Sequence, residues 1–129
     1  MKSSWPRVKC KINKFFDADH SLPQMGRAEL HRHSYWAEFG YWHEINPTTG
    51  VTKTIDDMMK DLDVVVERVS GKNLNEVLPV TPTLEFLACW MLCQLPAYWE
   101  FVVIRGYGCY EVEIHRDWLT ENWKKVLEK

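Results

Sequence analysis

The sequence predicts an α+β fold: a four-stranded antiparallel sheet with two helices on one face, in the order ββααββ. Apolar residues alternate with polar ones in two stretches before residue 45 and in two more after residue 100. Between them lie two segments with apolar residues at helical spacing. Two helices cannot cover both faces of such a sheet, so we expect them on one face and the other face free for assembly.

The first half of the chain supplies the first two strands. Residues 7–16 alternate and predict a strand, and residues 31–44, which are rich in aromatic side chains, predict a second one. Between them, residues 17–30 contain a proline, a glycine and few apolar residues, which predicts a loop. Residues 46–50 predict a turn that follows the second strand.

Two helices are expected in the middle of the chain. Residues 54–69 place apolar side chains at helical spacing, and residues 70–81 predict a loop. The second helix is predicted to begin with Thr81 as the N-cap and Pro82 in the first position, and to stop at Pro96. The first helix also has an acidic face that we expect to be solvated, made of Asp56, Asp57, Asp61 and Asp63.

The last part of the chain predicts two strands and a helical tail. Residues 101–104 and 110–114 are the strands, and the glycine-rich run 106–108 is the hairpin turn between them. Residues 116–129 have apolar residues at helical spacing and predict a short third helix. The whole 129-residue chain is expected to be a single domain with its core in residues 7–115.

Composition excludes several classes of function. The net charge of −2 gives no basic field for nucleic acid, and no apolar run is long enough to cross a membrane. The N-terminal Met1–Pro6 lacks the apolar stretch of a signal peptide, so we expect a cytoplasmic protein. The seven tryptophans fit either the core or a subunit interface. In a reducing cytosol we expect buried thiols at Cys10, Cys89, Cys93 and Cys109.

Three of the five histidines lie close together in the sequence: His20, His31 and His33. Residues i and i+2 of a strand point to the same face, so His31 and His33 can occupy two corners of a tetrahedral metal site. His20 can join them if a hairpin brings the first strand alongside. Three protein ligands and an open position are the pattern of catalytic zinc; a solvated pair on a strand is the alternative. The other two, His43 and His115, are expected to be hydrogen-bonded or exposed.

Four short motifs occur in a characteristic order. They are Phe16–His20 (F-D-A-D-H), His31–Tyr35 (H-R-H-S-Y), Leu74–Asn75 and Pro82–Glu85 (P-T-L-E). Together they resemble the 6-pyruvoyl/6-carboxy-tetrahydropterin synthase family, whose segments read F-x-A-x-H, H-G-H-[NS]-[YF], L-D-H-x-x-L-N and P-T-x-E. The resemblance implies a T-fold (tunnelling fold) and a homo-oligomer, a trimer or dimer of trimers, with pterin pockets between subunits. It also implies zinc held by His20, His31 and His33.

The chain departs from the chemistry that the resemblance implies. In that family a cysteine removes a proton beside zinc, an Asp-His pair assists it, and a glutamate anchors the pterin ring. Here the cysteine position holds Arg27, and the glutamate of a related variant falls on Ala28, with Glu29 next to it. The Asp-His pair falls on Ser70–Gly71, and the anchoring glutamate falls on Arg105 or the glycine after it.

These replacements change the expected ligand. Arginine keeps its proton and cannot act as a base, so Arg27, Arg32 and Arg105 either bring positive charge to the metal for an anionic ligand or are solvated. The P-T-x-E match adds Thr83 and Glu85. The candidate ligand-binding residues are therefore Thr83, Glu85, Arg27 and Arg105.

Two functions remain open at this point. The first is a zinc-dependent lyase of the tetrahydropterin synthase type, acting on dihydroneopterin triphosphate or a related phosphorylated ligand, with Glu29, Glu111 or Glu113 as the base. The second is a catalytically inactive or repurposed T-fold protein that keeps the metal for stability or ligand binding and acts through its assembly or a partner.

Overall fold

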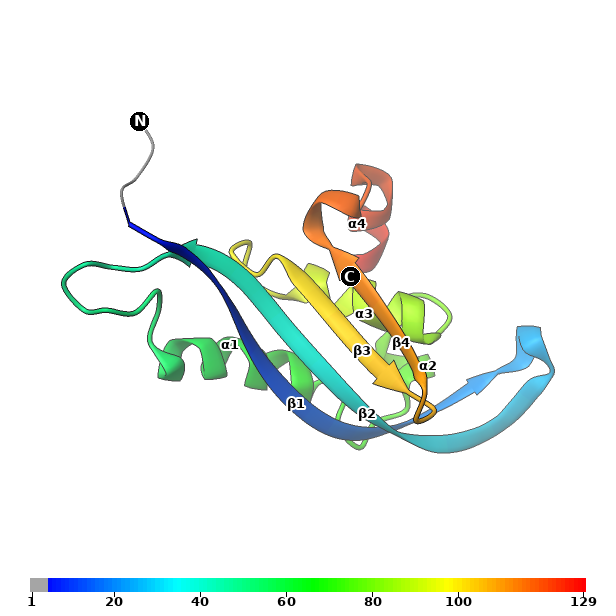
Figure 1. Ribbon diagram of the computed structural model, residues 1–129. Helices are drawn as coiled ribbons and strands as arrows, with labels where there is room; N and C mark the ends of the chain where they lie inside the picture. The colour runs from blue at the N-terminus through cyan, green and yellow to red at the C-terminus, as the bar shows by residue number, and fades with distance from the viewer. Residues whose placement is uncertain (1–4) are drawn as a thin grey trace.

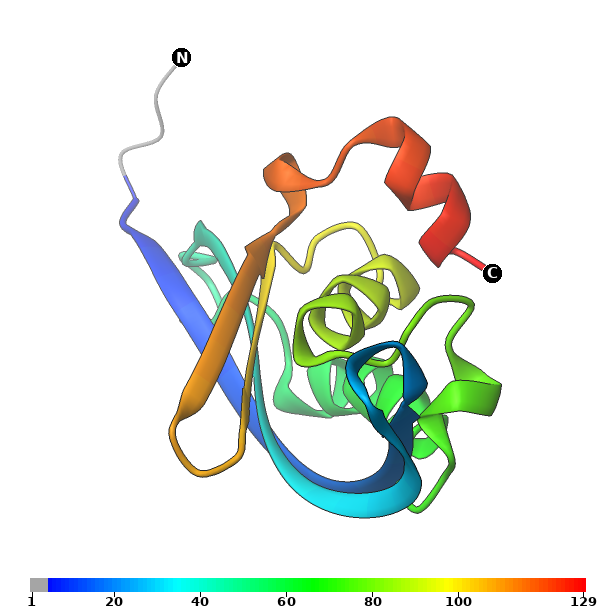
Figure 2. The same cartoon turned by 90° about the vertical axis from the view of Figure 1, so that its right-hand side faces the viewer.

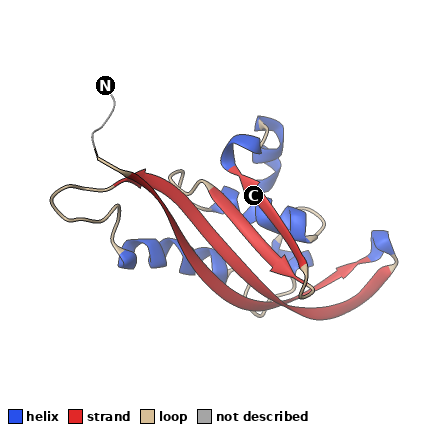
Figure 3. Ribbon diagram, viewed as in Figure 1, coloured by secondary structure: helices blue, strands red, loops and turns tan. Residues whose placement is uncertain are grey.

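The computed structural model describes residues 5–129. The prediction that the N-terminus lacks a signal peptide therefore falls mostly on residues outside the described part of the chain. One four-stranded sheet runs through the molecule in the order β1-β2-β3-β4, and every neighbouring pair is antiparallel. Figures 1 and 3 show the strands side by side in this order. The strands are β1 (Arg7–Leu22), β2 (Arg27–Glu44), β3 (Phe101–Gly106) and β4 (Tyr110–His115). The predicted fold class and element order are confirmed.

The first hairpin is longer than predicted, and the predicted loop over residues 17–30 is wrong. β1 continues to Leu22 and β2 begins at Arg27, with only a 3-10 turn, η1 (Pro23–Met25), and Gly26 between them. Gly26 has a φ of 73°, a left-handed conformation that glycine adopts freely. The polar residues near the end of β1 are the outward positions of a strand whose alternate side chains are buried. This long, curved hairpin extends beyond the other strands (Figure 1).

The helices lie on one face of the sheet, as Figure 2 shows from the side. They are α1 (Ile55–Glu67), α2 (Leu74–Val77), α3 (Leu84–Gln94) and α4 (Glu121–Leu127). The predicted N-cap of the second long helix is wrong: Thr83, and not Thr81, accepts a hydrogen bond of 3.1 Å from the backbone N–H of Phe86. Pro82 therefore precedes the helix, and its carbonyl is free to accept a bond from elsewhere.

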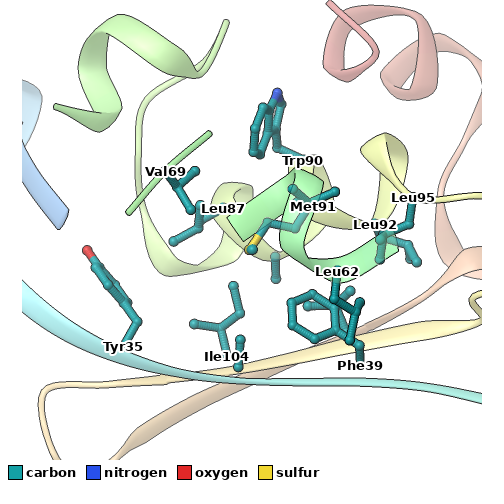
Figure 4. Close-up of a cluster of buried hydrophobic side chains, with 14 of the residues drawn as sticks. Tyr35, Phe39, Leu62, Val69, Leu87, Trp90, Met91, Leu92, Leu95 and Ile104 are labelled. Carbon is teal, nitrogen blue, oxygen red and sulfur yellow. The ribbon is translucent and has the colours of Figure 1, made fainter. Parts of the chain in front are cut away.

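The core lies between the sheet and the two long helices. Figure 4 shows Tyr35, Phe39 and Ile104 rising from the sheet toward Leu62 of α1 and Met91 of α3. All of these side chains are at most 3% exposed. Two of the seven tryptophans, Trp90 and Trp99, are fully buried, whereas Trp118 and Trp123 are exposed. Tryptophans therefore serve both the core and the surface.

The acidic face of α1 was predicted to be solvated, but the structure shows that it is only partly so. Asp61 is half-buried and accepts hydrogen bonds from the Tyr98 hydroxyl and, at 3.1 Å, from the Trp99 indole N–H. Asp63 pairs with Lys14 at 2.6 Å. Asp61 thus ties α1 to the segment that leads into β3.

The segment after α1 is also more ordered than the predicted loop. It contains the short helix α2, and it pairs with the end of β1. The backbone N–H of Gly71 donates to the carbonyl of Asp17 at 2.7 Å, and the N–H of Asp19 donates to the carbonyl of Lys72 at 2.8 Å. These bonds fix the part of β1 that leads to His20.

The C-terminal tail forms the predicted short helix. It begins with the 3-10 turn η2 (Arg116–Trp118), and α4 then packs on α3. The Gln94 side-chain amide donates to the carbonyl of Leu127 at 2.8 Å, and the rings of Phe86 and Trp123 lie 5.3 Å apart. Within residues 5–129, every helix is too short or too polar to cross a membrane.

The cysteines correct one prediction. Cys109 lies exposed on the β3–β4 turn, and Cys10, Cys89 and Cys93 are half-buried rather than fully buried. Burial raises the pKa of the Cys89 thiol, and it raises that of Cys93 to about 11. Both thiols on α3 therefore stay protonated near neutral pH, which makes them poor nucleophiles.

Candidate metal centre

The structure brings His20, His31 and His33 together on the inner face of the first hairpin. His20 of β1 lies directly opposite His31 of β2 in the strand register, and His33 is two residues further along the same face of β2. The three ring centroids lie 4.6 to 4.8 Å apart. One nitrogen from each ring lies within 4.8 Å of the other two, a spacing that suits a shared metal ion.

Backbone carbonyls orient two of the three rings. His20 Nδ1 lies 2.8 Å from the carbonyl oxygen of Pro82, and His31 Nδ1 lies 2.9 Å from that of Glu29. A carbonyl only accepts, so each Nδ1 must carry the proton and each Nε2 keeps a free lone pair. This arrangement, with the second nitrogen bonded to a main-chain oxygen, is the usual environment of a metal-ligating histidine.

Two ring nitrogens at the centre are buried without a partner. His20 is only 1% exposed, and both its Nε2 and that of His33 lack any hydrogen bond among the described residues. Buried polar atoms are nearly always paired. A metal ion between the rings would satisfy both atoms at once, so the residues present fit the zinc that the resemblance implies.

Burial disfavours the charged form of two of the three histidines, His20 and His33. Burial lowers the pKa of His20 and of His33, and the neighbouring histidines lower both further. The positive charge of Arg27 adds a smaller effect on the pKa of His33. Neutral imidazoles with free lone pairs are the form that binds metal.

Asn75 secures the position of His20 from outside the hairpin. Its side-chain oxygen accepts from the backbone N–H of Ser21 at 2.8 Å, and its amide donates to the Ser21 carbonyl at 3.0 Å. Nothing in the periodicity of the sequence points to this role. The Leu74–Asn75 motif was the only available signal, and only through the family resemblance.

Arg27 and Glu29 lie on the same side of β2 as the histidines. Both line an open pocket of about 450 Å³ together with His31. Arg27 also lies close enough to His33 to affect its pKa. The candidate ligand residue Arg27 and the candidate base Glu29 therefore border the metal centre.

The other two arginines point away from the histidines. Arg32 lies on the opposite face of β2, where it pairs with Asp19 through two bonds of 2.8 and 3.2 Å. Arg105 stacks over Trp36 at 4.7 Å and bonds Glu111 at 3.0 Å, also on the outer face. Of the two alternatives for these arginines, the structure agrees with the one in which they are solvated and point away from this chain's histidines. The predicted ligand-binding role of Arg105 stays a prediction.

Thr83 and Glu85 lie at the start of α3, next to the carbonyl that bonds His20. Thr83 caps the helix, and the Glu85 carboxylate accepts a bond of 3.0 Å from the Tyr110 hydroxyl. Their ligand-binding role remains a prediction. The remaining histidines are hydrogen-bonded, as expected: His43 Nδ1 lies 3.0 Å from the Glu44 carbonyl, and His115 lies 2.7 Å from the Glu113 carboxylate.

Comparisons with known proteins show the family and the fold of the chain. A sequence model of the 6-pyruvoyl tetrahydropterin synthase family matches residues 9–124. The chain belongs to this family. Among solved structures, 6-pyruvoyl tetrahydropterin synthase of Caenorhabditis elegans is similar, with a TM-score of 0.80 at 20% identity. The match covers 86% of this chain and 96% of that chain.

The structural likeness shows the shared T-fold and nothing finer, because so few residues are identical. No curated protein matches the sequence. Membership of the 6-pyruvoyl tetrahydropterin synthase family therefore rests on the family match over most of the chain and on the common fold. The metal, the ligand and the reaction have to be argued from this chain's own residues.

Proposed function

We propose that the protein binds zinc through His20, His31 and His33 and holds a small anionic ligand, a pterin derivative or a related phosphorylated compound, beside the metal. The observation that carries this proposal is the convergence of three imidazoles, two of which have a buried, unpartnered Nε2 atom. Imidazole nitrogens suit several transition metals. Three histidines with an open fourth position are the arrangement typical of catalytic zinc.

The chain's own groups prepare the site for such a ligand. The carbonyls of Pro82 and Glu29 hold two rings in the tautomer that binds metal. Arg27, which borders the same pocket as His31, supplies a permanent positive charge for a carboxylate or phosphate. When bound, zinc would add a Lewis acid that polarises an oxygen of the ligand.

Metal analysis of matched variants tests the zinc site. We expect one zinc per chain in the purified protein and none in His31→Ala or His33→Ala, measured by mass spectrometry of the metal content. His43→Ala is the control, because it removes an exposed histidine from the same strand. Equal zinc in all four proteins would refute the proposed ligands.

A lyase reaction on dihydroneopterin triphosphate is the second candidate function. One observation favours it: Glu29 borders the pocket beside His31, where a carboxylate could accept a proton from a ligand. The positions that resemble the family's cysteine base, Asp-His pair and glutamate anchor hold other residues, and this argues for binding without turnover. The balance favours a repurposed binding protein.

Turnover by the zinc-loaded protein separates the two. If the lyase function is right, the zinc-loaded protein converts dihydroneopterin triphosphate, Glu29→Gln abolishes the conversion and Glu111→Gln does not. Glu111 is a matched control, since its carboxylate is bonded to Arg105 on the outer face. Full zinc occupancy without conversion would leave the binding function as the proposal.

We also propose that the chain acts as a cytoplasmic homo-oligomer, a trimer or dimer of trimers. Large aromatic side chains stay exposed in the single chain: Phe15 on the outer face of β1 is 75% exposed and Trp118 is 61% exposed. Exposed aromatic side chains are enriched at protein interfaces. Sedimentation velocity tests this, and a monomer at micromolar concentration would contradict it.

A further inference from the structure

The β3–β4 turn holds one residue in an uncommon conformation. Tyr107 has a φ of 57° and is the only non-glycine residue with a positive φ among residues 5–129. The left-handed conformation is unfavourable for an L-residue, because its Cβ comes close to the following carbonyl oxygen. Glycines flank it on both sides, at positions 106 and 108. A large aromatic side chain in this place calls for a compensating contact.

The turn is held firmly against the start of α3. A Cβ added to Gly106 would lie only 3.1 Å from Leu84 Cδ1, so the backbone packs closely on the helix. The Tyr110 hydroxyl donates to the Glu85 carboxylate at 3.0 Å on the other side of the turn. The residue before this helix cap is Pro82, whose carbonyl bonds His20. The turn and the metal centre are therefore supported by the same helix end.

The contact made by Tyr107 is with a metal-site histidine. Its ring centroid lies 4.6 Å from that of His33, with the planes at 74° to each other. Its phenol also lies near Tyr35, whose pKa is raised mainly by burial and further by Tyr107. Tyr107 is still 51% exposed, so its ring lies between His33 and solvent rather than within the core.

The open pocket lies in the other direction along β2. Arg27, Glu29 and His31 line it, and they precede His33 on the same strand. Successive residues on one face of a strand are roughly 6.6 Å apart. The centre therefore has a polar, open side at His31 and a side covered by an aromatic ring at His33.

We propose that Tyr107 is a specificity-determining residue of the metal centre: its ring closes the His33 side, so that ligands reach the open coordination position only through the pocket of Arg27, Glu29 and His31. The proposal rests on the metal centre proposed above. Glycine would adopt the left-handed backbone at position 107 more easily than tyrosine does. The unfavourable backbone conformation is therefore accepted in order to place an aromatic ring over His33. Removing the ring opens a second, less selective approach to the metal.

Zinc transfer to a chelator tests the cover. The zinc-loaded full chain is mixed with 4-(2-pyridylazo)resorcinol over a range of concentrations, and the coloured complex is followed by stopped-flow absorbance. Tyr107→Gly removes the ring and suits the left-handed backbone, so the turn is retained. Tyr107→Phe keeps the ring and removes the hydroxyl. Cys109→Ala, on the same exposed turn, is the control.

If the Tyr107 ring covers the metal centre, removing it should speed up zinc transfer to the chelator. In Tyr107→Gly the second-order rate constant, which depends on chelator concentration, rises by about tenfold or more, comparable with the smaller effects of changing groups that contact metal ligands. Tyr107→Phe and Cys109→Ala transfer zinc at the wild-type rate. Circular dichroism and the melting temperature of each variant verify that the fold is kept.

Several other results of this experiment would overturn the proposed role of Tyr107. If only the chelator-independent rate rises in Tyr107→Gly, the ring merely supports His33 and the proposal is overturned. Unchanged rates, or a Tyr107→Phe variant as fast as Tyr107→Gly, overturn it as well. If the wild-type chain binds no zinc, the proposed metal centre fails and the cover with it. If all variants bind zinc normally and Tyr107→Gly transfers it at the wild-type rate, only the proposed role of Tyr107 is refuted, and the metal centre stands.

Discussion

The three metal-site histidines are expected to contribute unequally to the stability of the metal-free protein. Both His20 and His33 have a buried Nε2 with no partner, but His20 also makes a buried hydrogen bond of 2.8 Å to the Pro82 carbonyl. Each substitution removes one unsatisfied nitrogen, but only His20→Ala also leaves the Pro82 carbonyl without its partner in a buried place. Both variants lose a proposed zinc ligand, but only the first removes a bond that holds the hairpin to the start of α3.

The cost of His20→Ala follows from these contacts. An unpaired buried acceptor costs about 1–3 kcal/mol, and the small cavity brings the total to about 2–4 kcal/mol. An unfolding entropy of about 2.1 cal/mol/K per residue gives about 0.27 kcal/mol/K for 129 residues. The melting temperature of the metal-free protein should therefore fall by about 7–15 °C in His20→Ala, and by clearly less in His33→Ala.

Thermal and urea unfolding, followed by circular dichroism in excess EDTA, measure this difference directly. The same experiment with zinc should stabilise the wild type and leave both variants nearly unchanged, since stabilisation by a ligand requires its binding to the folded state. Equal losses for His20→Ala and His33→Ala in EDTA would refute the reasoning that the Pro82 bond fixes His20. Stabilisation of His33→Ala by zinc to the wild-type extent would refute its role as a ligand.

Three further predictions concern packing, pH and the α1 contact. Gly40→Ala should destabilise the protein by about 1–3 kcal/mol in urea unfolding, because its Cβ would lie 2.0 Å from the Phe101 ring; a neutral effect would contradict the close packing. Burial lowers the pKa of His20 and His33, so the unfolded chain binds more protons than the folded one as pH falls below about 6.5. The metal-free protein should lose stability over that range, and a flat profile from pH 8 to pH 5 would contradict this. Asp61→Ala leaves the Tyr98 hydroxyl and the Trp99 indole N–H without their acceptor. It should therefore lower the free energy of unfolding in urea more than Asp61→Asn does.

Much of the fold was predictable because it depends on periodicity. The two long helices and the four strands appear in the sequence as regular apolar spacing, and the structure has them in the predicted order. The end of the first hairpin was missed because its outward residues, such as Asp17 and Asp19, are polar and resemble a loop. Their carbonyl and N–H groups bond the segment after α1, a long-range pairing that local patterns do not reveal.

The candidate site was predictable to the extent that strand geometry places side chains. The spacing of His31 and His33 fixed a common face, and the hairpin register then placed His20 opposite His31. The same alternation puts Arg32 on the other face, which strand parity alone would have shown. Tyr107 was missed because its contact with His33 comes from a turn whose left-handed backbone gives no signal in a tyrosine.

The orientation of the candidate metal ligands depends little on the side chains around them. The bonds that orient His20 and His31 go to the main-chain carbonyls of Pro82 and Glu29, and any residue type supplies a carbonyl at those positions. A proton-accepting base depends on a single side chain. Arg27 keeps its proton and its positive charge at the position where the family resemblance implies a cysteine that removes a proton. Substitutions around the ligands can therefore change the chemistry of the pocket while the histidines keep their orientation for metal.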